Sequence, residues 1–489
     1  MKASVIGSGF SGLAAASYLG KEGIDVEIYE KNDDIGGRAR SFKTQNGYTF
    51  DMGPSWYWMP EIFENFFNNF GFSQSDFYKL KLLDPSFKMI FKDDFVIDVP
   101  SDYEKLCELF ESLETGSAGK LKKFMNEAEY KYNLGMNKLA QKPGNSLFEY
   151  FDFRFLKGLA SMDVFSSFSS HIRKYFSHPA IISILEFPVL FLGAMPSKTP
   201  ALYSLMNYAG LKLGTWYPEG GFGNVINAFK KVTEKYSIPI NLSSPVSSII
   251  VNKNKARAVR VNGVDVNTDA IIASADYHHV ESKLLEYEFR NYSESYWDKK
   301  TFAPSCLIYY VGITKKIKNL NHHNLFFQND LNLHAEEIYD SPKWPTQPLF
   351  YLCCPSKSDK TIAPEGHENL FLLLPIAPGL EDDTKIREKY FDIMMDRIEK
   401  FTSEKIRQFI DYKKSYCISD FISDYNAYKG NAYGLANTLR QTAVLKPKIR
   451  SKKINNLFFT GQLTVPGPGV PPAILSGKIA ANELIKSFR

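Results

Sequence analysis

Short apolar runs and one helix-like stretch alternate at the amino end of the chain. Residues 3–6 (Ala-Ser-Val-Ile) predict a short buried strand, and residues 25–29 alternate between polar and apolar side chains, which predicts a second strand. Between them, residues 11–21 have a helical pattern with several small side chains that permit close packing. This order predicts a strand–turn–helix–strand unit of about 30 residues.

The rest of the chain changes pattern twice. Residues from about 60 to 214 are aromatic and largely of helical pattern, and a strand-rich part follows. The last part holds a strand, a segment rich in glycine and proline, and a final helix. The predicted strands cover residues 246–251, 258–261, 270–273, 305–311, 370–374 and 457–460, and the predicted helices cover residues 225–235, 384–401 and 473–487.

A glycine-rich turn joins the first predicted strand to the first helix. Gly7 permits a tight turn, Gly9 lets the backbone approach a pyrophosphate, and Gly12 lets the helix pack on the strand. The start of the helix offers free N–H groups to the phosphates. Glu30 ends the second strand, where a carboxylate accepts hydrogen bonds from ribose hydroxyls and disfavours NADP. The predicted dinucleotide site therefore contains Gly7, Gly9, Phe10, Ser11, Gly12, Glu30 and Lys31.

Further glycine segments follow this unit. In Gly36-Gly37-Arg38 the glycines let the chain run close to the dinucleotide, and the planar donor fork of Arg38 can reach a phosphate. Gly53, Pro54 and Ser55 follow a strand-like segment, and they either complete the same site or form a plain turn. A third loop, at residues 217–223, opens a helix and either lines the ligand or only needs positive φ.

The segment 460–472 completes the predicted site from the other end of the chain. Its prolines remove backbone donors and fix the path, its glycines leave the backbone bare, and Pro471 or Pro472 suits the first turn of a helix. The amino end of that helix would face the N1/C2=O edge of a reduced flavin and favour hydride uptake, so the predicted cofactor is FAD. The predicted contacts here are Gly461, Gln462, Gly469, Val470 and Pro471.

Composition limits the other functions. The 489 residues carry 59 Lys and Arg against 54 Asp and Glu, and a net charge of +5 gives no reason to expect nucleic-acid binding. Aromatic residues make up 15% of the chain, enough to wall a large apolar pocket as well as build a core. Five cysteines without paired spacing favour a reduced, cytosolic setting, and no run reaches the roughly 20 apolar residues of a membrane span.

Two minor features could bind ligands. The basic residues between Lys446 and Lys453 form either a solvated face or a contact with anionic lipid headgroups. The pairs His278-His279 and His322-His323 are adjacent in sequence, and neighbours on a regular element point apart, so no metal site is predicted.

Taken together, the motifs resemble those of the bacterial-type phytoene desaturases, which are FAD-dependent carotenoid desaturases of the flavin amine oxidase-like superfamily. The resemblance extends over essentially the whole chain, and the Gly/Pro segment is its most specific part. It rests on residues 7–12, 36–38, 51–54, 186–194, 203–206, 217–223, 273–276 and 466–472.

The resemblance implies an α/β fold: a Rossmann-like FAD-binding domain with an interleaved α+β substrate domain and a helical membrane-facing region. It implies that Glu30 holds the adenosine ribose, that Arg38 faces the phosphates and that Val246 meets the adenine through its backbone. It also places Gly461 near the pyrophosphate and Val470 near the flavin ring. Gln462 departs from the acidic residue of many superfamily members, which implies an uncharged contact. The domain boundaries expected are 1–75, 215–285 and 415–489 for the FAD-binding segments, 76–214 for the helical region and 286–414 for the substrate domain.

The expected function is desaturation of phytoene to a more conjugated carotene such as lycopene. The enzyme would sit peripherally on the cytoplasmic side of a membrane, draw the polyene into an apolar tunnel near residues 187–206, and pass electrons to a quinone or oxygen. No catalytic base is predicted, and the oligomeric state stays open. Alternatives are a desaturase of a later hydroxylated or methoxylated carotenoid, a flavin-dependent carotenoid isomerase, an amine oxidase, and a binding protein of GDP-dissociation-inhibitor type.

Overall fold

A parallel sheet forms the nucleotide-binding half of the molecule. The computed structural model describes residues 1–146, 149, 166–438 and 440–489. The sheet order is β19-β13-β1-β2-β9, and every neighbouring pair in it is parallel. Its strands come from three separated parts of the chain: β1 (Lys2–Ile6), β2 (Asp25–Tyr29), β9 (Ile240–Asn241), β13 (Ala270–Ala273) and β19 (Leu457–Phe459). The predicted Rossmann-like α/β unit is confirmed.

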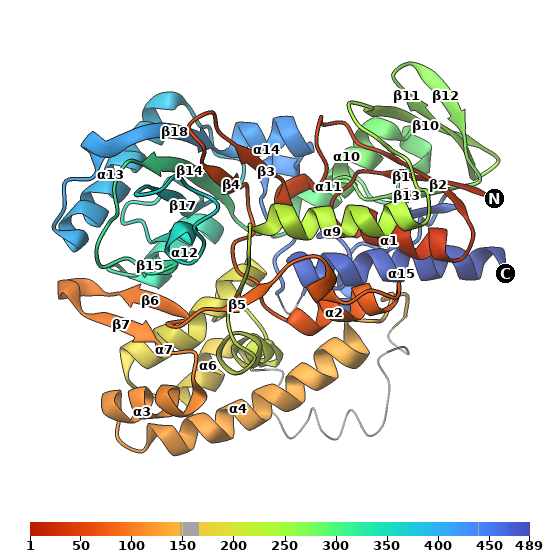
Figure 1. Ribbon diagram of the computed structural model, residues 1–489. Coiled ribbons are helices and arrows are strands. Elements are labelled where there is room, and N and C mark those ends of the chain that lie inside the picture. The colour runs from red at the N-terminus through yellow and green to blue at the C-terminus, as the bar shows by residue number, and fades with distance from the viewer. Residues whose placement is uncertain (147–148, 150–165, 439) are drawn as a thin grey trace.

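Three helices lie beside this sheet (Figure 1). They are α1 (Phe10–Lys21), α9 (Phe222–Lys235) and α15 (Val470–Phe488). Helices α1 and α15 pack closely because a glycine stands at the contact: a Cβ on Gly477 would lie 2.3 Å from the carbonyl oxygen of Ser11. Gly12 is equally constrained, since its Cβ would lie 2.1 Å from the Gly7 oxygen. The amino and carboxyl ends of the chain are therefore joined around one site.

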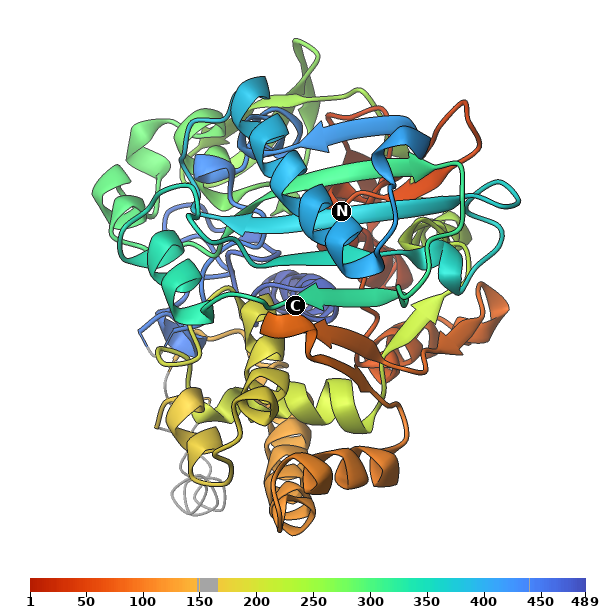
Figure 2. The same cartoon turned by 90° about the vertical axis from the view of Figure 1, so that its left-hand side faces the viewer.

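A second, larger sheet forms the other half. Its order is β18-β14-β17-β16-β15-β6-β7. Helix α13 (Thr384–Thr402) crosses one face of it (Figure 2) and buries Tyr390, Phe391 and Met394 against the strands. The strands are β6 (Phe87–Ile90), β7 (Val96–Val99), β14 (Ser305–Ile313), β15 (His323–Phe326), β16 (Phe350–Cys353), β17 (Glu368–Ile376) and β18 (Ile410–Tyr416).

The region expected to be helical, residues 76–214, only partly follows that expectation. It forms α3 (Tyr103–Leu113), α4 (Ser117–Leu134), α6 (Phe168–Arg173), α7 (Pro179–Glu186) and α8 (Leu205–Asn207) below the sheets (Figure 1). However, β6 and β7 join the large sheet, because β6 pairs with β15, and β5 (Leu80–Leu82) pairs with β8 (Trp216–Pro218). In the part of the chain that the structure describes, no helix has both the length and the apolar character needed to cross a bilayer.

Smaller elements connect these layers. An antiparallel sheet of β10 (Val246–Asn252), β11 (Lys255–Val261) and β12 (Val264–Asn267) flanks the parallel sheet, and β3 (Ser41–Lys43) pairs with β4 (Thr49–Asp51). The connecting helices are α2 (Pro60–Asn68), α10 (Tyr277–His279), α11 (Glu294–Asp298), α12 (Leu331–Tyr339) and α14 (Ile418–Tyr425).

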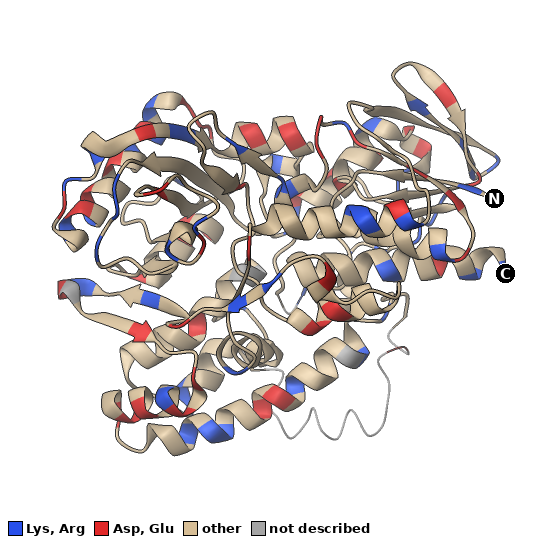
Figure 3. Cartoon of the chain, viewed as in Figure 1, with Lys and Arg blue, Asp and Glu red and all other residues tan. Residues whose placement is uncertain are grey.

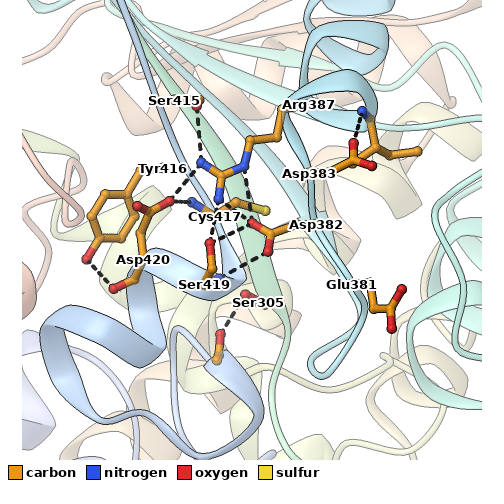
Figure 4. A network of polar contacts seen from close by, with 12 residues as sticks. Ser305, Glu381, Asp382, Asp383, Arg387, Ser415, Tyr416, Cys417, Ser419 and Asp420 are labelled. Carbon is orange, nitrogen blue, oxygen red and sulfur yellow. Dashed lines mark hydrogen bonds and ion pairs between the residues drawn. The ribbon is translucent and has the colours of Figure 1, made fainter.

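An ion-pair network ties α13 to α14 (Figure 4). Arg387 on α13 pairs with Asp382 and, at 2.8 Å, with Asp420 on α14, and it donates to Ser415 and Ser419. The side chain of Asp382 is only 5% exposed, so its charge depends on this partner. The network fixes α14, which ends at the cavity described below.

Charge is mixed over the face shown in Figure 3, where acidic and basic residues share α4 and α9. The predicted basic cluster near the carboxyl end is not wholly on the surface. Lys446 is only 2% exposed, and burial lowers the pKa of its amine to about 7. Lys448 donates to the carbonyl oxygens of Gly144 and Val444. A uniformly solvated basic face is therefore the wrong description.

Candidate active site

One cavity of about 650 Å³ runs from the first glycine turn to the space between the large sheet and the helical region. Of the predicted cofactor contacts, only Gly12 does not line it, because Gly12 packs the helix on the strand instead. The predicted residues that line it are Gly7, Gly9, Phe10, Ser11, Glu30, Lys31, Gly37, Arg38, Gly53, Pro54, Ser55, Val246, Gly461, Gln462, Gly469, Val470 and Pro471. Both ends of the chain thus meet in one site.

The turn at Gly9 is shaped for a ligand. A Cβ on Gly9 would have no atom of the described residues within 4 Å, so the protein's own packing gives no reason for a glycine there. Helix α1 begins at the next residue and has no side-chain cap, so its first N–H groups are open to an acceptor. Open space in front of a bare backbone and uncapped donors fit a pyrophosphate.

Glu30 lies where the ribose was expected, but its carboxylate is already well hydrogen-bonded. It accepts the backbone N–H and hydroxyl of Ser8 at 2.9 and 2.8 Å, and the backbone and side-chain N–H groups of Asn32 at 2.9 and 3.0 Å. A carboxylate has about four acceptor sites, so ribose hydroxyls would take the places of the two side-chain donors. The Ser8 hydroxyl and the Asn32 amide can rotate away, so the residue fits its expected role.

Arg38 brings a cation to the cavity wall. Its Nε is buried and has no partner within the described residues, where the guanidinium donates only to the Asn431 oxygen, at 3.3 Å. The guanidinium lies over the Tyr425 ring at 4.9 Å. Burial lowers the pKa of Arg38 and raises that of the neighbouring carboxyl of Asp276. An arginine with spare donors fits an anionic phosphate, as predicted.

The carboxyl-terminal loop is held in place by one side chain. The Ser476 hydroxyl accepts the Gly461 N–H at 3.0 Å and bonds to the hydroxyls of Thr460 and Thr464 at 2.9 and 3.0 Å. Gly461 and Gly469 have φ values of +106° and +110°, which other residues rarely adopt. Helix α15 then begins at Val470 with proline in its first turn, as predicted, and its amino end faces the cavity.

The cavity continues into an apolar arm. The segment predicted as a tunnel contributes Phe187, Leu190 and Met206 to its wall. The loop at residues 217–223 does not line the cavity; it packs near Asp51, which accepts the N–H groups of Phe222 and Gly223. The other apolar wall residues include Trp56, Trp58, Leu325, Phe327, Leu331, Ile338, Leu349 and Leu373. Such a wall suits a long hydrocarbon rather than a polar substrate.

A few polar groups interrupt this wall. His334 is fully engaged, since its Nδ1 accepts the Leu349 N–H at 3.0 Å and its Nε2 donates to the Pro375 oxygen at 2.9 Å. The hydroxyls of Tyr339 and Tyr433 have no hydrogen-bond partner within the described residues, and burial raises the pKa of both. They stay protonated and can donate to an oxygen in the cavity. No local motif marks these three residues, so sequence reasoning missed them.

The fold and this site define a flavin-dependent oxidoreductase. A family model described as flavin containing amine oxidoreductase matches residues 10–485, and the chain belongs to that family. It is 39% identical over 486 residues to a carotenoid 3,4-desaturase of Haloarcula japonica, covering 99% of this chain and 98% of the relative. A zeta-carotene-forming phytoene desaturase of Myxococcus xanthus is 27% identical, with 98% and 93% covered.

Solved structures agree on the fold. An oxidoreductase from Methanosarcina mazei matches with a TM-score of 0.63 at 16% identity, covering 98% of this chain and 99% of that one. The expected resemblance to the carotenoid desaturases is confirmed, and the protein is an FAD-dependent oxidoreductase.

Proposed function

We propose that the protein is a carotenoid desaturase whose substrate is already conjugated, in the manner of a 3,4-desaturase. The observation that carries this proposal is the 39% identity over nearly the full length of both chains to the carotenoid 3,4-desaturase. A diapophytoene desaturase of Staphylococcus haemolyticus is 29% identical, and the phytoene desaturase of Myxococcus xanthus is 27% identical. The expected conversion of phytoene to lycopene is therefore the second candidate.

The residues present suit dehydrogenation of a hydrocarbon. When bound, FAD supplies the acceptor for a hydride. The apolar arm aligns an extended chain and excludes water, and the conjugated substrate itself spreads the positive charge that hydride loss leaves. Strong acid–base groups are less necessary in this reaction than in hydrolysis. The polar groups beside the apolar arm include tyrosine hydroxyls and a fully bonded His334, which fits that requirement.

The free tyrosine hydroxyls favour an oxygenated substrate. Tyr339 and Tyr433 are half-buried residues of a largely apolar cavity wall, and neither hydroxyl has a hydrogen-bond partner among the described residues. A hydroxyl or methoxyl oxygen on the carotenoid would accept from one of them. This supports the later, hydroxylated or methoxylated carotenoid over an unsubstituted one.

Pigment analysis tests the proposal. The gene is co-expressed in separate bacterial strains that accumulate phytoene, lycopene or a 1-hydroxylated acyclic carotenoid, and the extracts are compared by chromatography and mass spectrometry. We expect loss of two hydrogens from the conjugated carotenoids and little change in phytoene. Conversion of phytoene alone would replace the proposal with the second candidate.

Delivery from a membrane also remains a proposal. A long polyene resides in a lipid leaflet, so we expect the protein to bind peripherally there, with a quinone or oxygen taking the electrons. Co-flotation of purified protein with anionic liposomes would support this, and recovery of all the protein in the lipid-free fraction would contradict it.

A further inference from the structure

Three buried side chains that could bind a metal meet outside the cavity. His322 precedes β15, His323 begins that strand, and Cys353 ends β16. His323 and Cys353 are direct partners in the antiparallel register. One ligand atom from each of the three residues lies within 4.8 Å of the others, and none of the three lines the large cavity.

The two histidines converge despite being neighbours in sequence. Their ring centroids lie 4.4 Å apart at an interplanar angle of 68°. The expectation that adjacent side chains point apart holds within a regular strand, but His322 lies just before the first residue of β15. The two imidazoles can therefore face one common point.

Several nitrogen atoms in this cluster that could bind a metal have no hydrogen-bond partner among the described residues. Both ring nitrogens of His322 and Nε2 of His323 are buried without a hydrogen bond in the described part of the chain. Unsatisfied polar atoms in an interior cost about 1–3 kcal/mol each, and they commonly mark a water or ion that completes the site. Three such atoms beside a thiol are more than ordinary packing explains.

The surroundings orient His323 as a ligand. Its Nδ1 bonds to the Tyr351 hydroxyl at 2.7 Å, and that hydroxyl donates to Ser55 at 3.0 Å, so Nδ1 carries the proton. The lone pair is then on Nε2, the unpartnered atom. The Trp56 ring stacks on the imidazole at 3.9 Å and restricts its rotation. In metal sites, a histidine ligand usually donates its other ring N–H to a neighbouring acceptor, which fixes the orientation of the ring.

Space for an ion or a water lies next to these atoms. A small cavity of about 30 Å³ is lined by His322 and Cys353 together with Asp51, Ser55 and Tyr217. That volume holds roughly one water-sized occupant. Metal–ligand bonds of about 2.0–2.3 Å would place donor atoms about 3.3–3.8 Å apart, so binding requires the ligand atoms to close by about 1 Å.

We infer that His322, His323 and Cys353 form a binding site for a divalent transition metal of the zinc class, with water from the small cavity as the fourth ligand. Two imidazoles and one thiolate are ligands that zinc prefers. The role is structural. The metal would fix His323, which stacks on Trp56 and reaches Ser55 through the Tyr351 hydroxyl; Ser55 and Trp56 both line the large cavity.

Metal content and a cobalt spectrum test the inference. The FAD-loaded, tag-free protein, with its cysteine thiols kept reduced, is equilibrated with zinc and dialysed against metal-free buffer. Its zinc content is then measured by elemental mass spectrometry. We expect about one equivalent of zinc per chain. Replacement by Co²⁺ should give long-wavelength d–d bands beyond the flavin absorption and a thiolate charge-transfer band. Absence of retained zinc and of both cobalt signals in the folded wild-type protein would overturn the site.

The chain offers a matched control one residue away. Cys354 is also buried but belongs to the opposite core cluster, with its sulfur near the Ser356 hydroxyl. We expect Cys353→Ser to abolish the thiolate band and to lower the zinc affinity at least tenfold. Cys354→Ser should keep both the band and the affinity. His322→Gln should weaken zinc while circular dichroism and flavin content show a folded protein. Equal zinc affinity in Cys353→Ser and Cys354→Ser would refute the assignment.

Discussion

Replacing Gly9 by alanine separates cofactor binding from folding. Gly9 has φ −70° and ψ 175°, which alanine adopts readily, and its added methyl would touch no protein atom within 4 Å. The stability of the apoprotein should therefore change by less than about 0.5 kcal/mol. With FAD bound, the same methyl would occupy the space in front of the backbone, and overpacking of one methyl costs about 1–3 kcal/mol. The expected loss of FAD affinity is about fivefold to 150-fold.

Gly12→Ala is the matched control, because it adds the same methyl one turn further along α1. There the Cβ would lie 2.1 Å from the Gly7 oxygen and 3.1 Å from the Ser274 hydroxyl, so the helix must shift. We expect an apoprotein destabilised by about 3 kcal/mol or more, at the upper end of overpacking costs.

Two measurements on each apoprotein decide the comparison. Urea unfolding gives the stability, and quenching of flavin fluorescence on titration gives the FAD dissociation constant. Wild-type FAD affinity in Gly9→Ala would show that the pyrophosphate does not pass this turn. A Gly9→Ala apoprotein as unstable as Gly12→Ala would show that the residue serves packing.

Three further outcomes are expected. Arg387→Met should lower the free energy of unfolding by about 1–3 kcal/mol in a denaturant titration, because it leaves the buried Asp382 side chain without its ion pair. Lys413→Met, which loses a more exposed ion pair, should lower it by under about 1 kcal/mol. Equal losses in the two variants would contradict the role of the network. The Tyr339→Phe, Tyr433→Phe double variant should raise KM for a hydroxylated carotenoid about tenfold and leave the unsubstituted carotenoid unchanged, and equal effects on both would remove the proposed contact. Burial raises the pKa of Asp51 to about 7, so the folded protein binds the proton of this carboxyl more tightly than the unfolded chain does. The contribution of Asp51 to the free energy of unfolding is therefore fully present below about pH 4 and is lost as the pH rises through 7. The stability of wild type relative to Asp51→Asn should fall by about 2 kcal/mol between pH 5 and 8, and a flat difference would contradict the shift.

Local patterns were enough to predict the nucleotide half. Gly7 has a positive φ, Gly12 has no room for a Cβ, and Gly9 leaves open space for a ligand, so the turn could be recognised from its sequence alone. The segment 460–472 could also be recognised from its sequence, since Gly461 and Gly469 adopt positive φ values that favour glycine. Strands β1, β13 and β19 were predicted because buried parallel strands are short apolar runs between turn signals, and β2 was predicted because its polar and apolar side chains alternate.

Features that depend on distant residues were not predictable in this way. The hairpin of β6 and β7 was read as part of a helical region, because its pairing with β15 joins segments more than 200 residues apart. The cluster of His322 and Cys353 likewise exists only through the register of β15 and β16. Tyr339 and Tyr433 reach one cavity from separate elements, and no spacing between them records that meeting.

Anaerobic reduction of the bound flavin by a carotenoid tests whether the protein is a carotenoid desaturase. The purified FAD-loaded protein is mixed, without oxygen, with liposomes that contain one candidate carotenoid, and the flavin absorbance and the carotenoid mass are followed together. We expect a conjugated carotenoid to reduce the flavin, which loses its absorbance, and to lose two hydrogens per flavin reduced. A flavin that stays oxidised with every carotenoid but is bleached by an amine would contradict it.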